Sequence, residues 1–236
     1  MRECCTKEYD NLSLINVWEI CYKTSTSKRL WDIERKYRIT GSRCYSLYTY
    51  TSNKNPNWIT NSLKYFIGNS LTKKFVKHGR EMEPLAKLLY KYVNPDCTIF
   101  EPGLLVCQDN PWLGYSADGI IFQPGMHTKL LEIKCPYNGK TEGIKYVIQN
   151  CKYLVKENDV YTLKTRHVYY GQVQLGMFVN NLASTDFCIY SSYDNGMYII
   201  NIQKNEEFIH KMLTKLKHHF FEHMLHTICL SKNKEL

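Results

Sequence analysis

Long apolar runs are missing from this sequence of 236 residues. Segments such as 120–122 and 197–200 fall far short of the ~18–20 residues that a membrane-spanning helix needs. The first residues, Met-Arg-Glu-Cys-Cys, also lack the apolar core of a secretory signal. Hydrophobic residues still make up 44% of the chain, which excludes a disordered or fibrous protein. We therefore expect a soluble, intracellular globular protein with no membrane partner, and the sequence does not distinguish nucleus from cytoplasm.

The ten cysteines include no Cys-x-x-Cys pair, so the spacing of zinc ribbons is absent. A chain of this length, without a secretory route, can build its core without disulfides. We expect most of the cysteines to be buried, reduced thiols that pack as small hydrophobic groups. The sequence also contains a cluster of four histidines near its C-terminal end: His218, His219, His223 and His226. On a helix, the last three would share one face, which suits either a metal site or a packing or subunit-contact face.

Acidic residues are scarce between Lys23 and Arg80, where thirteen Lys and Arg residues accompany only two acids. The whole chain has a formal net charge of +9, so the remainder is slightly acidic. A one-sided basic block suits a phosphate-rich partner, because each cation near a phosphate releases counterions. A merely solubilising surface is the alternative.

Hydrophobic periodicity predicts helices at both ends of the chain and strands in the middle. We expect helices over 12–22, 28–37, from Ser42, from about 57, and over 73–92 with Pro84 inside, 167–180 and 206–229. We expect strands over 98–100, 104–107, 119–122 and 129–135, and a hairpin of 187–191 with 197–202 around Asp194-Asn195-Gly196. This order predicts an α/β (α+β) fold with a central mixed β-sheet flanked by helices.

Candidate catalytic residues lie in two segments, 113–119 and 131–136. Glu132 and Lys134 are two apart, so on a strand they point to the same face. Asp118 precedes an apolar strand, and a hairpin-like connection would bring it beside Glu132. Two neighbouring carboxylates favour a divalent cation, beside which a lysine can orient a water and stabilise charge on phosphorus. A simple salt bridge between Glu132 and Lys134 at the strand end is the alternative.

The surrounding motifs resemble those of the YqaJ-like viral recombinase nucleases of the lambda exonuclease type, in the PD-(D/E)XK superfamily. The motifs are Trp31 and Arg35 with Arg38–Ser42, then His78–Ala86, then Asp118 with Glu132-x-Lys134, and then Tyr169–Gln174. They occur in the family's order and cover about residues 31–180. Two positions depart from the pattern: Gly41 replaces the usual alanine, and Ala117 replaces the proline before the aspartate. No catalytic position is missing.

The resemblance implies a restriction-endonuclease-like fold and a single nuclease domain over 1–236. It comprises an N-terminal helical extension (1–30), a nuclease core (31–203) and a C-terminal helix (204–236). The implied metal ligands are the carboxylates of Asp118, Glu132 and Glu83 and the backbone carbonyl of Ile133. The implied ion is Mg²⁺, which fits an all-oxygen site, and Mn²⁺ is expected to substitute. For Glu83 alone, a helical ion pair with Lys87 is the alternative.

The remaining roles are also implied by the resemblance. Lys134 would position the attacking water, and Gln172 would bond that water or the scissile phosphate. Arg35 and Ser42 would hold a terminal 5′-phosphate, although Arg35 can also be read as one member of the basic face. Gln174 is assigned to DNA binding. Because it lies about 200° from Gln172 on a helix, at most one of the two faces the metal, and we choose Gln172.

The activity implied is metal-dependent 5′→3′ hydrolysis of linear double-stranded DNA to 5′-mononucleotides, in viral or mobile-element recombination. A single-strand annealing protein and a homo-oligomer are left open as further partners. Two alternatives are kept. One is an endonuclease or an RNA-acting nuclease with the same metal site, and the other is a catalytically silent DNA-binding recombination module.

The basic block between Lys23 and Arg80 predicts that binding to duplex DNA weakens as the salt concentration rises. If about six of its cations contact phosphates, log K for a duplex should fall with log salt at a slope of about −5. Fluorescence anisotropy of a labelled duplex, measured without divalent metal over a salt series, gives this slope. A slope near zero would mean that the block serves solubility only.

Overall fold

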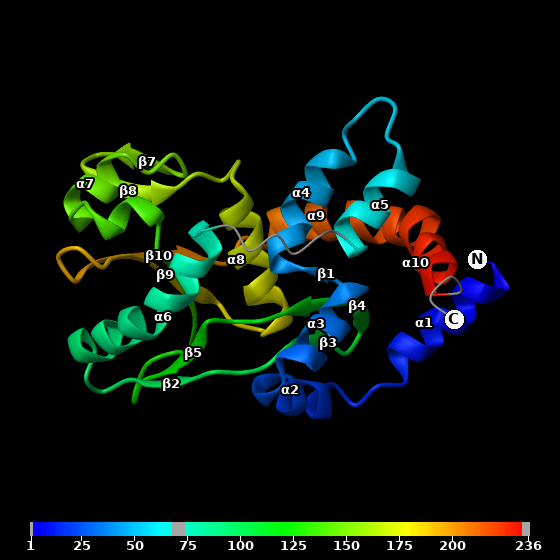
Figure 1. The fold of residues 1–236 in the computed structure, drawn as a ribbon, viewed down its shortest axis with the longest axis horizontal. Coiled ribbons are helices and arrows are strands. Elements are labelled where there is room, and N and C mark those ends of the chain that lie inside the picture. The colour runs from blue at the N-terminus through cyan, green and yellow to red at the C-terminus, as the bar shows by residue number, and fades with distance from the viewer. Residues whose placement is uncertain (1, 68–73, 233–236) are drawn as a thin grey trace.

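Alternating apolar residues in the middle of the chain build a five-stranded mixed sheet (Figure 1). The computed structural model describes residues 2–67 and 74–232. The sheet has the order β10-β9-β6-β5-β2, in which β6 and β9 are parallel and the other neighbours are antiparallel. Its strands are β2 (Thr98–Phe100), β5 (Gly119–Phe122), β6 (Lys129–Lys134), β9 (Ser184–Ser191) and β10 (Gly196–Gln203).

Two smaller sheets accompany this central sheet. One has the order β1-β4-β3 and the other is the β7-β8 hairpin. Their strands are β1 (Ile39–Thr40), β3 (Leu105–Cys107), β4 (Asn110–Tyr115), β7 (Leu154–Glu157) and β8 (Val160–Leu163). The helices are α1 (Glu3–Ser13), α2 (Val17–Thr26), α3 (Lys28–Lys36), α4 (Gly41–Tyr50), α5 (Trp58–Ile67), α6 (Lys74–Val93), α7 (Ile144–Gln149), α8 (Val168–Val179), α9 (Glu206–His219) and α10 (Leu225–Lys232). A 3₁₀ turn, η1 (Tyr137–Lys140), and a π-helical turn, η2 (Phe220–Met224), complete the list.

The alternation along β6 decides which side chains face which helix. Leu131 and Ile133 pack against α6 through Ala86 and Tyr90. Leu130 points to the other face and packs with the α8 side chains, among them Val173 and Met177. Successive side chains of a strand point to opposite faces, so Glu132 and Lys134 share the α8 face with Leu130. Strand β6 is the middle strand of the five, and the sheet has a helix on each face, as predicted.

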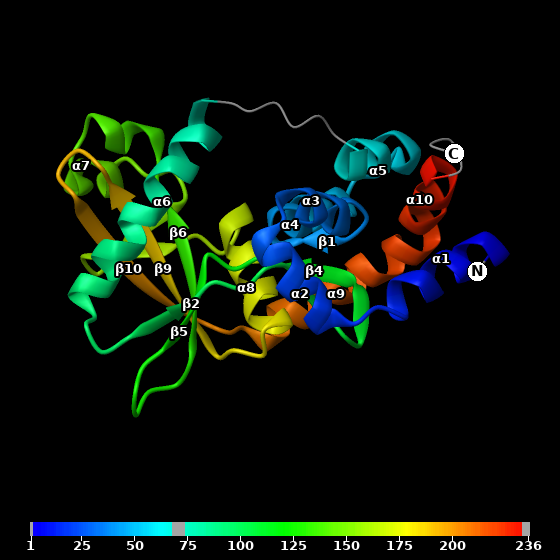
Figure 2. The ribbon, with the colours of Figure 1, turned by 60° about the horizontal axis from the view of Figure 1, so that its bottom comes forward.

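A second core joins the two ends of the chain. Ile39, Leu47 and Trp112 pack there with residues of α1, α9 and α10. Figures 1 and 2 both show α1 lying beside α10 at the end of the molecule away from the central sheet. Strand β4 runs from this helical half toward the central sheet, which connects the two halves of the fold.

Several predicted elements are confirmed, including the helix capped by Ser27, which begins at Lys28, and the hairpin of β9 and β10. The expected helix over 12–22 is wrong. The chain breaks at Asn16, whose side chain accepts hydrogen bonds from the backbone N–H groups of Trp18 and Glu19 and so starts a new helix. Pro84 lies inside α6, which continues through it. Lys73, included in that predicted helix, lies outside the described residues.

The predicted closing helix over 206–229 is interrupted. The π-helical turn η2 separates α9 from α10, so the extra residue per turn changes the direction in which later side chains point. All ten cysteines are free thiols, and six of them are buried, as expected. Within residues 2–67 and 74–232, none of the helices has the length and apolar character needed to cross a membrane.

Candidate functional site

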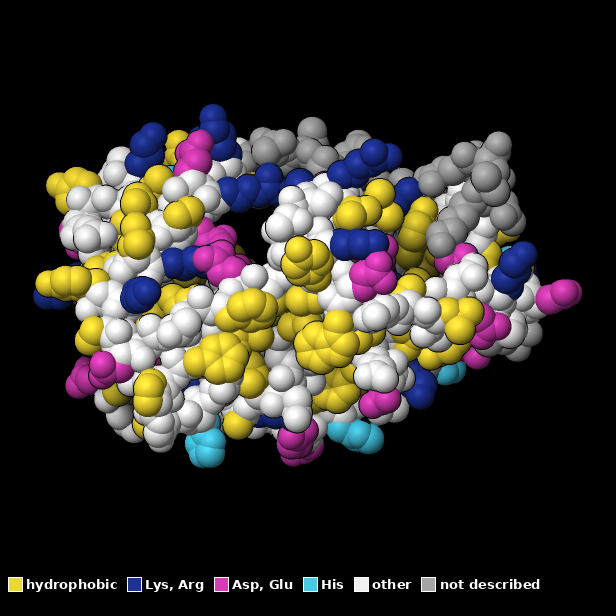
Figure 3. All heavy atoms as spheres, turned by 90° about the horizontal axis from the view of Figure 1, so that it is seen from below, with side chains coloured by type: hydrophobic (Ala, Val, Ile, Leu, Met, Phe, Trp, Pro, Cys, Tyr) yellow, Lys and Arg dark blue, Asp and Glu magenta, His cyan; other side chains and the backbone are white. Residues whose placement is uncertain are grey.

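A cleft of about 680 Å³ lies where the central sheet meets the N-terminal helices. Its wall combines residues of α3, α4, α6, β4, β6 and α8 with the connection between β4 and β5. Figure 3 shows acidic and basic side chains gathered around a hollow near the middle of one face. Both signs of charge therefore meet in the same cleft, which favours a ligand that carries negative charge and a metal ion together.

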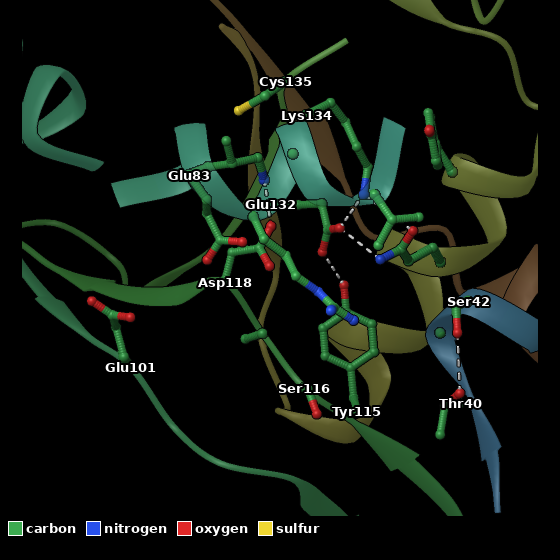
Figure 4. A pocket seen from close by; sticks show the side chains of 18 of the residues that line it. Thr40, Ser42, Glu83, Glu101, Tyr115, Ser116, Asp118, Glu132, Lys134 and Cys135 are labelled. Carbon is green, nitrogen blue, oxygen red and sulfur yellow. Dashed lines mark hydrogen bonds and ion pairs between the residues drawn. The ribbon is translucent and has the colours of Figure 1, made fainter. Parts of the chain in front are cut away.

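The carboxylate of Glu132 is the most enclosed charge in the cleft, with only 1% of the residue exposed. One oxygen accepts hydrogen bonds from Lys134 Nζ at 2.5 Å and from Gln172 Nε2 at 2.6 Å. The other accepts a hydrogen bond from the Tyr115 hydroxyl at 2.6 Å. Figure 4 shows Lys134 and Tyr115 reaching Glu132 from opposite sides. These partners come from β6, α8 and β4, so the carboxylate is held by three separate elements.

Lys134 remains a cation in this setting. Burial alone would lower the pKa of its ammonium group, but the nearby carboxylates of Glu132 and Asp118 raise it above the ordinary value. The ammonium also lies 4.5 Å from the centre of the Tyr169 ring and 3.4 Å from Gln172 Oε1. A lysine that keeps its proton donates hydrogen bonds and stabilises negative charge, and it does not serve as a general base.

Asp118 lies across from Glu132, as the sequence predicts. One of its oxygens accepts a hydrogen bond from the backbone N–H of Ile133 at 2.7 Å, which fixes the connection between β4 and β5 against β6. Burial and the charges of Glu132 and Glu83 raise the pKa of Asp118 well above its usual range, and Lys134 opposes this shift only in part. The ionised form of Asp118 is therefore disfavoured in the cleft.

Glu83 adds a third carboxylate from α6. Figure 4 shows it pointing toward Asp118, with Glu101 beyond. Its carboxylate also lies 2.8 Å from Lys87 Nζ, so the helical pair considered in the sequence analysis is present as well. Lys87 bonds Glu101 at 2.7 Å. Burial lowers the pKa of Lys87, but these two acids outweigh that effect and raise it. Lys87 thus compensates part of the acidic charge at the outer edge of the cleft.

The donor set fits a hard divalent cation. Asp118, Glu132 and Glu83 supply carboxylate oxygens, and the backbone of Ile133 lines the same cleft. Mg²⁺ and Mn²⁺ prefer oxygen ligands of this kind. The raised pKa of Asp118 is consistent with this, because burial first and then repulsion from Glu132 and Glu83 disfavour its ionised form, a cost that a bound cation would relieve. The residues present therefore fit a hard divalent cation.

Arg35 and Ser42, the residues suggested for a 5′-phosphate, lie together at a cationic corner of the cleft. The Arg35 guanidinium donates a hydrogen bond to Ser42 Oγ at 3.2 Å and lies 3.8 Å from the centre of the Trp31 ring. Trp31 in turn donates from Nε1 to Ser116 Oγ at 2.8 Å. Ser116 stands two residues before Asp118, so this chain of contacts ties the cationic corner to the carboxylates. Burial and the neighbouring Arg43 lower the pKa of Arg35 to about 10, so it remains charged at neutral pH.

The two glutamines of α8 point in different directions, as the helical spacing predicts. Gln172 faces Glu132 in the cleft. Gln174, which the sequence analysis assigns to DNA binding, does not line the cleft. It is fully buried, its amide group donates to the Gln203 carbonyl at 2.9 Å, and its carbonyl accepts from the Asn205 backbone N–H at 2.8 Å. Gln174 therefore joins α8 to the segment before α9, and that assignment is corrected.

Two members of the basic block also have structural roles. Arg38 is buried and bonds the side chain of Glu34 and the backbone carbonyl of Pro111. Arg43 donates to the backbone carbonyls of Arg35 and Lys36. These guanidinium groups hold α3, β1 and α4 together, and the N–H groups used in these bonds are not available to an external phosphate. Fewer cations of the block can bind a ligand than its charge suggests.

The histidine cluster does not form a metal site of its own among the described residues. His219 and His223 stack on Trp58, with ring centres 4.8 and 5.3 Å away. Of the two roles considered for the histidines, a metal site and a packing face, His219 and His223 therefore have the packing role. His226 lies beyond the π-helical turn and points elsewhere.

Two residues of the cleft escaped the sequence analysis. Tyr115 bonds Glu132, and burial together with Glu132 raises the pKa of its phenol well above 10, so it stays a donor. The signal that could have found it is its place in the candidate segment 113–119, three residues before Asp118. Glu101 follows β2, and its sequence surroundings contain no comparable signal.

The model of the YqaJ-like viral recombinase domain matches residues 30–187. No match was found among the curated proteins. Among solved structures, the fold is similar to that of an alkaline exonuclease, LHK-Exo, from Laribacter hongkongensis. The two share 20% identity and a TM-score of 0.62 over 88% of this chain and 97% of that one.

Two further structures resemble the fold. The SOX protein of Kaposi's sarcoma-associated herpesvirus, solved in complex with RNA, has a TM-score of 0.57 at 12% identity, over 94% of this chain and 74% of that one. A phage-related exonuclease from Haemophilus somnus has a TM-score of 0.51 at 14% identity, over 85% of this chain and 99% of that one. These likenesses show the restriction-endonuclease-like fold predicted from the sequence.

The raised pKa of Asp118 predicts how pH and metal act together on stability. An acid whose pKa is raised by folding stabilises the fold less as pH rises above its ordinary pKa, because the unfolded state gives up its proton there while the folded state still holds it. A bound cation relieves this cost, so Mg²⁺ should raise Tm, and by more at about pH 8.5 than at about pH 6. Thermal melts with and without Mg²⁺ at both pH values measure the effect.

The control for this prediction is a matched pair of variants. Asp118→Asn should lose the Mg²⁺ shift and its pH dependence, whereas Asp96→Asn, at an exposed acid, should keep both. An equal Mg²⁺ shift in wild type and Asp118→Asn would contradict the assignment of Asp118 as a ligand.

Proposed function

This chain belongs to the YqaJ-like viral recombinase family, a family of nucleases in DNA recombination, and we propose that it is a metal-dependent 5′→3′ exonuclease. Its substrate is linear double-stranded DNA and its product is 5′-mononucleotides. The observation that carries the proposal is the joint placement of Asp118, Glu132 and Lys134 in one cleft with the cationic corner of Arg35 and Ser42. Carboxylates and a lysine suit phosphodiester hydrolysis, and the cationic corner suits a strand end.

The metal has a defined role in this proposal. When bound by Asp118, Glu132, Glu83 and the Ile133 carbonyl, Mg²⁺ would polarise the phosphate and favour deprotonation of water. Mn²⁺ is expected to substitute, since both ions accept an all-oxygen set. The chain's own residues perform the remaining tasks.

Lys134 is suited to hold the attacking water and to stabilise the charge that grows on the phosphate oxygens. Its ammonium is fixed by Glu132 and keeps its proton, so its charge is preorganised. Gln172 lies within 3.4 Å of Lys134 and can bond the same water or the scissile phosphate. The water oxygen forms the new bond to phosphorus, and the bond from phosphorus to the 3′ oxygen breaks. The released nucleotide keeps its 5′-phosphate, and the shortened strand begins with a new 5′-phosphate.

Arg35 and Ser42 support the 5′→3′ direction. A terminal phosphate carries about two negative charges near neutral pH, against one for an internal phosphodiester. The guanidinium of Arg35 is held flat against Trp31 and offers paired donors, which suit a phosphate. Ser42 lies in the first turn of α4, where backbone N–H groups favour an anion. A phosphate seated there would set the next phosphodiester over the carboxylates.

RNA is the second candidate substrate. The structurally similar SOX protein has been solved with RNA as well as with DNA. The metal site acts on the phosphodiester and does not by itself exclude a ribose. Parallel digests of matched DNA and RNA duplexes decide between them, and the proposal expects the DNA duplex to be degraded faster. Closed circular DNA included in the same assay should survive, since an endonuclease would cut it.

Glu132→Gln should abolish hydrolysis while duplex binding persists. The substitution removes one charge from the carboxylate cluster but keeps the shape of the side chain and the cationic corner. Turnover is measured on a linear duplex with Mg²⁺, and binding is measured without divalent metal. Glu157→Gln, the same change at an exposed acid of β7, is the control and should retain full turnover. A silent binding module would give identical results for both variants and wild type.

End selection provides the second test. Linear duplex with a 5′-phosphate should be degraded faster than the same duplex with a 5′-hydroxyl, and Arg35→Ala should erase most of this difference. The measurement is the ratio of initial rates on the two duplexes. Arg29→Ala removes the same charge from an exposed position on the same helix and should leave the ratio unchanged. A wild-type ratio of one, or an equal loss in both variants, would move the endonuclease alternative ahead.

A further inference from the structure

A second group of metal-binding side chains lies where the two ends of the chain meet. Cys4 and Cys5 belong to α1, and His226 and Cys229 belong to α10. The sulfur atoms of Cys4, Cys5 and Cys229 all lie within 4.8 Å of one another. The Nδ1 atom of His226 lies 3.8 Å from the sulfur of Cys4 and 3.7 Å from that of Cys5. The three sulfur atoms therefore form one cluster, and the imidazole of His226 lies against two of them.

Four of the six distances between these ligand atoms match those around a zinc ion. With Zn–S of about 2.3 Å and Zn–N of about 2.0–2.1 Å, tetrahedral geometry places neighbouring sulfurs about 3.8 Å apart and sulfur about 3.6 Å from nitrogen. The sulfur of Cys5 lies 3.9 Å from that of Cys4 and 3.8 Å from that of Cys229. Four edges of the tetrahedron, two between sulfurs and two between sulfur and nitrogen, therefore agree with a zinc centre to within about 0.2 Å.

We propose that Cys4, Cys5, Cys229 and His226 bind one structural zinc ion that joins the first helix of the chain to the last. On binding, each thiol loses its proton to solvent, and the neutral imidazole coordinates through Nδ1 while keeping its proton on Nε2. Three protein thiolates and one imidazole complete the four-coordinate shell of a structural site. The ligands come from opposite ends of the sequence, so no Cys-x-x-Cys spacing is needed.

The location supports a structural role. Cys5 and Cys229 are only 3% and 5% exposed and belong to the same apolar core as Leu12, Leu225 and Ile228. Cys4 is exposed and leaves the ion a route from solvent. None of the four residues lines the cleft, and sulfur and nitrogen ligands prefer zinc over magnesium. This site is therefore distinct from the carboxylate site in position and in chemistry.

One contact has to change when zinc binds. The guanidinium of Arg2 lies against His226 Nε2. With the metal on Nδ1, that nitrogen carries a proton and no longer accepts a hydrogen bond. Arg2 is exposed and free to turn, and a site of three thiolates around Zn²⁺ has a net charge of −1, which keeps a nearby arginine favourable.

The test measures the zinc content of the purified full chain by mass spectrometry of its metals. About one zinc per chain is expected in wild type, and near zero in Cys229→Ser and in Cys4→Ser. Cys151→Ser, at a half-buried thiol outside the cluster, should keep its zinc. Asp118→Asn should also keep it, which separates this site from the carboxylate cleft. Removal of zinc by a strong chelator should lower Tm in wild type.

A second measurement covers the case in which the cysteine variants do not fold. Wild-type chain freed of zinc is titrated with Co²⁺, whose absorption reports tetrahedral thiolate ligation. Saturation at about one equivalent with intense thiolate bands supports the proposal. Wild type without zinc and without these bands would overturn it. So would zinc retained in Cys229→Ser, or a disulfide between Cys5 and Cys229 in protein purified under reducing conditions.

Discussion

The burial of a single carboxylate, that of Glu132, governs how the halves of this fold meet. An ionised group with 1% exposure is costly unless every oxygen has a partner. Its partners are Tyr115, Lys134 and Gln172, which stand on β4, β6 and α8. The three elements must therefore be positioned so that each brings its donor within hydrogen-bonding distance of the Glu132 carboxylate. Strand β4 pairs in parallel with β1, which leads directly into α4, so the same requirement also positions Ser42.

The acidic and the basic side chains of the cleft belong to different elements of the fold. Acids come from β6, from α6 and from the loops before β5 and after β2, while Arg35 comes from α3 in the helical half. The contact of Trp31 with Ser116 is one of the bonds that cross between these sources. The number of cations in the sequence is larger than the number that can contact a ligand. The reason is that Arg38 and Arg43 donate hydrogen bonds to backbone carbonyl groups of the protein itself.

Much of the site was predictable because it rests on local periodicity. Two-residue spacing placed Glu132 with Lys134, and helical spacing separated Gln172 from Gln174. Strand β4 was missed because it is buried along almost its whole length, so it shows no polar alternation, and Pro111 and Gly114 disfavour a strand assignment. The long-range contacts of Tyr115 and Glu101, and the meeting of Cys4 with Cys229, depend on tertiary packing that no sequence window contains.

The π-helical turn between α9 and α10 changes the direction in which the side chains of α10 point relative to those of α9. Each residue added to a helix rotates everything after it by about 100° relative to what came before. Before the turn, the helix directs His219 toward Trp58, and after it the side chains of His226 and Cys229 face α1. A regular helix of the same sequence would keep His226 in line with His219 and leave α1 without its partner. The one extra residue in this helical turn thus decides whether the last helix, α10, can contact the first helix, α1.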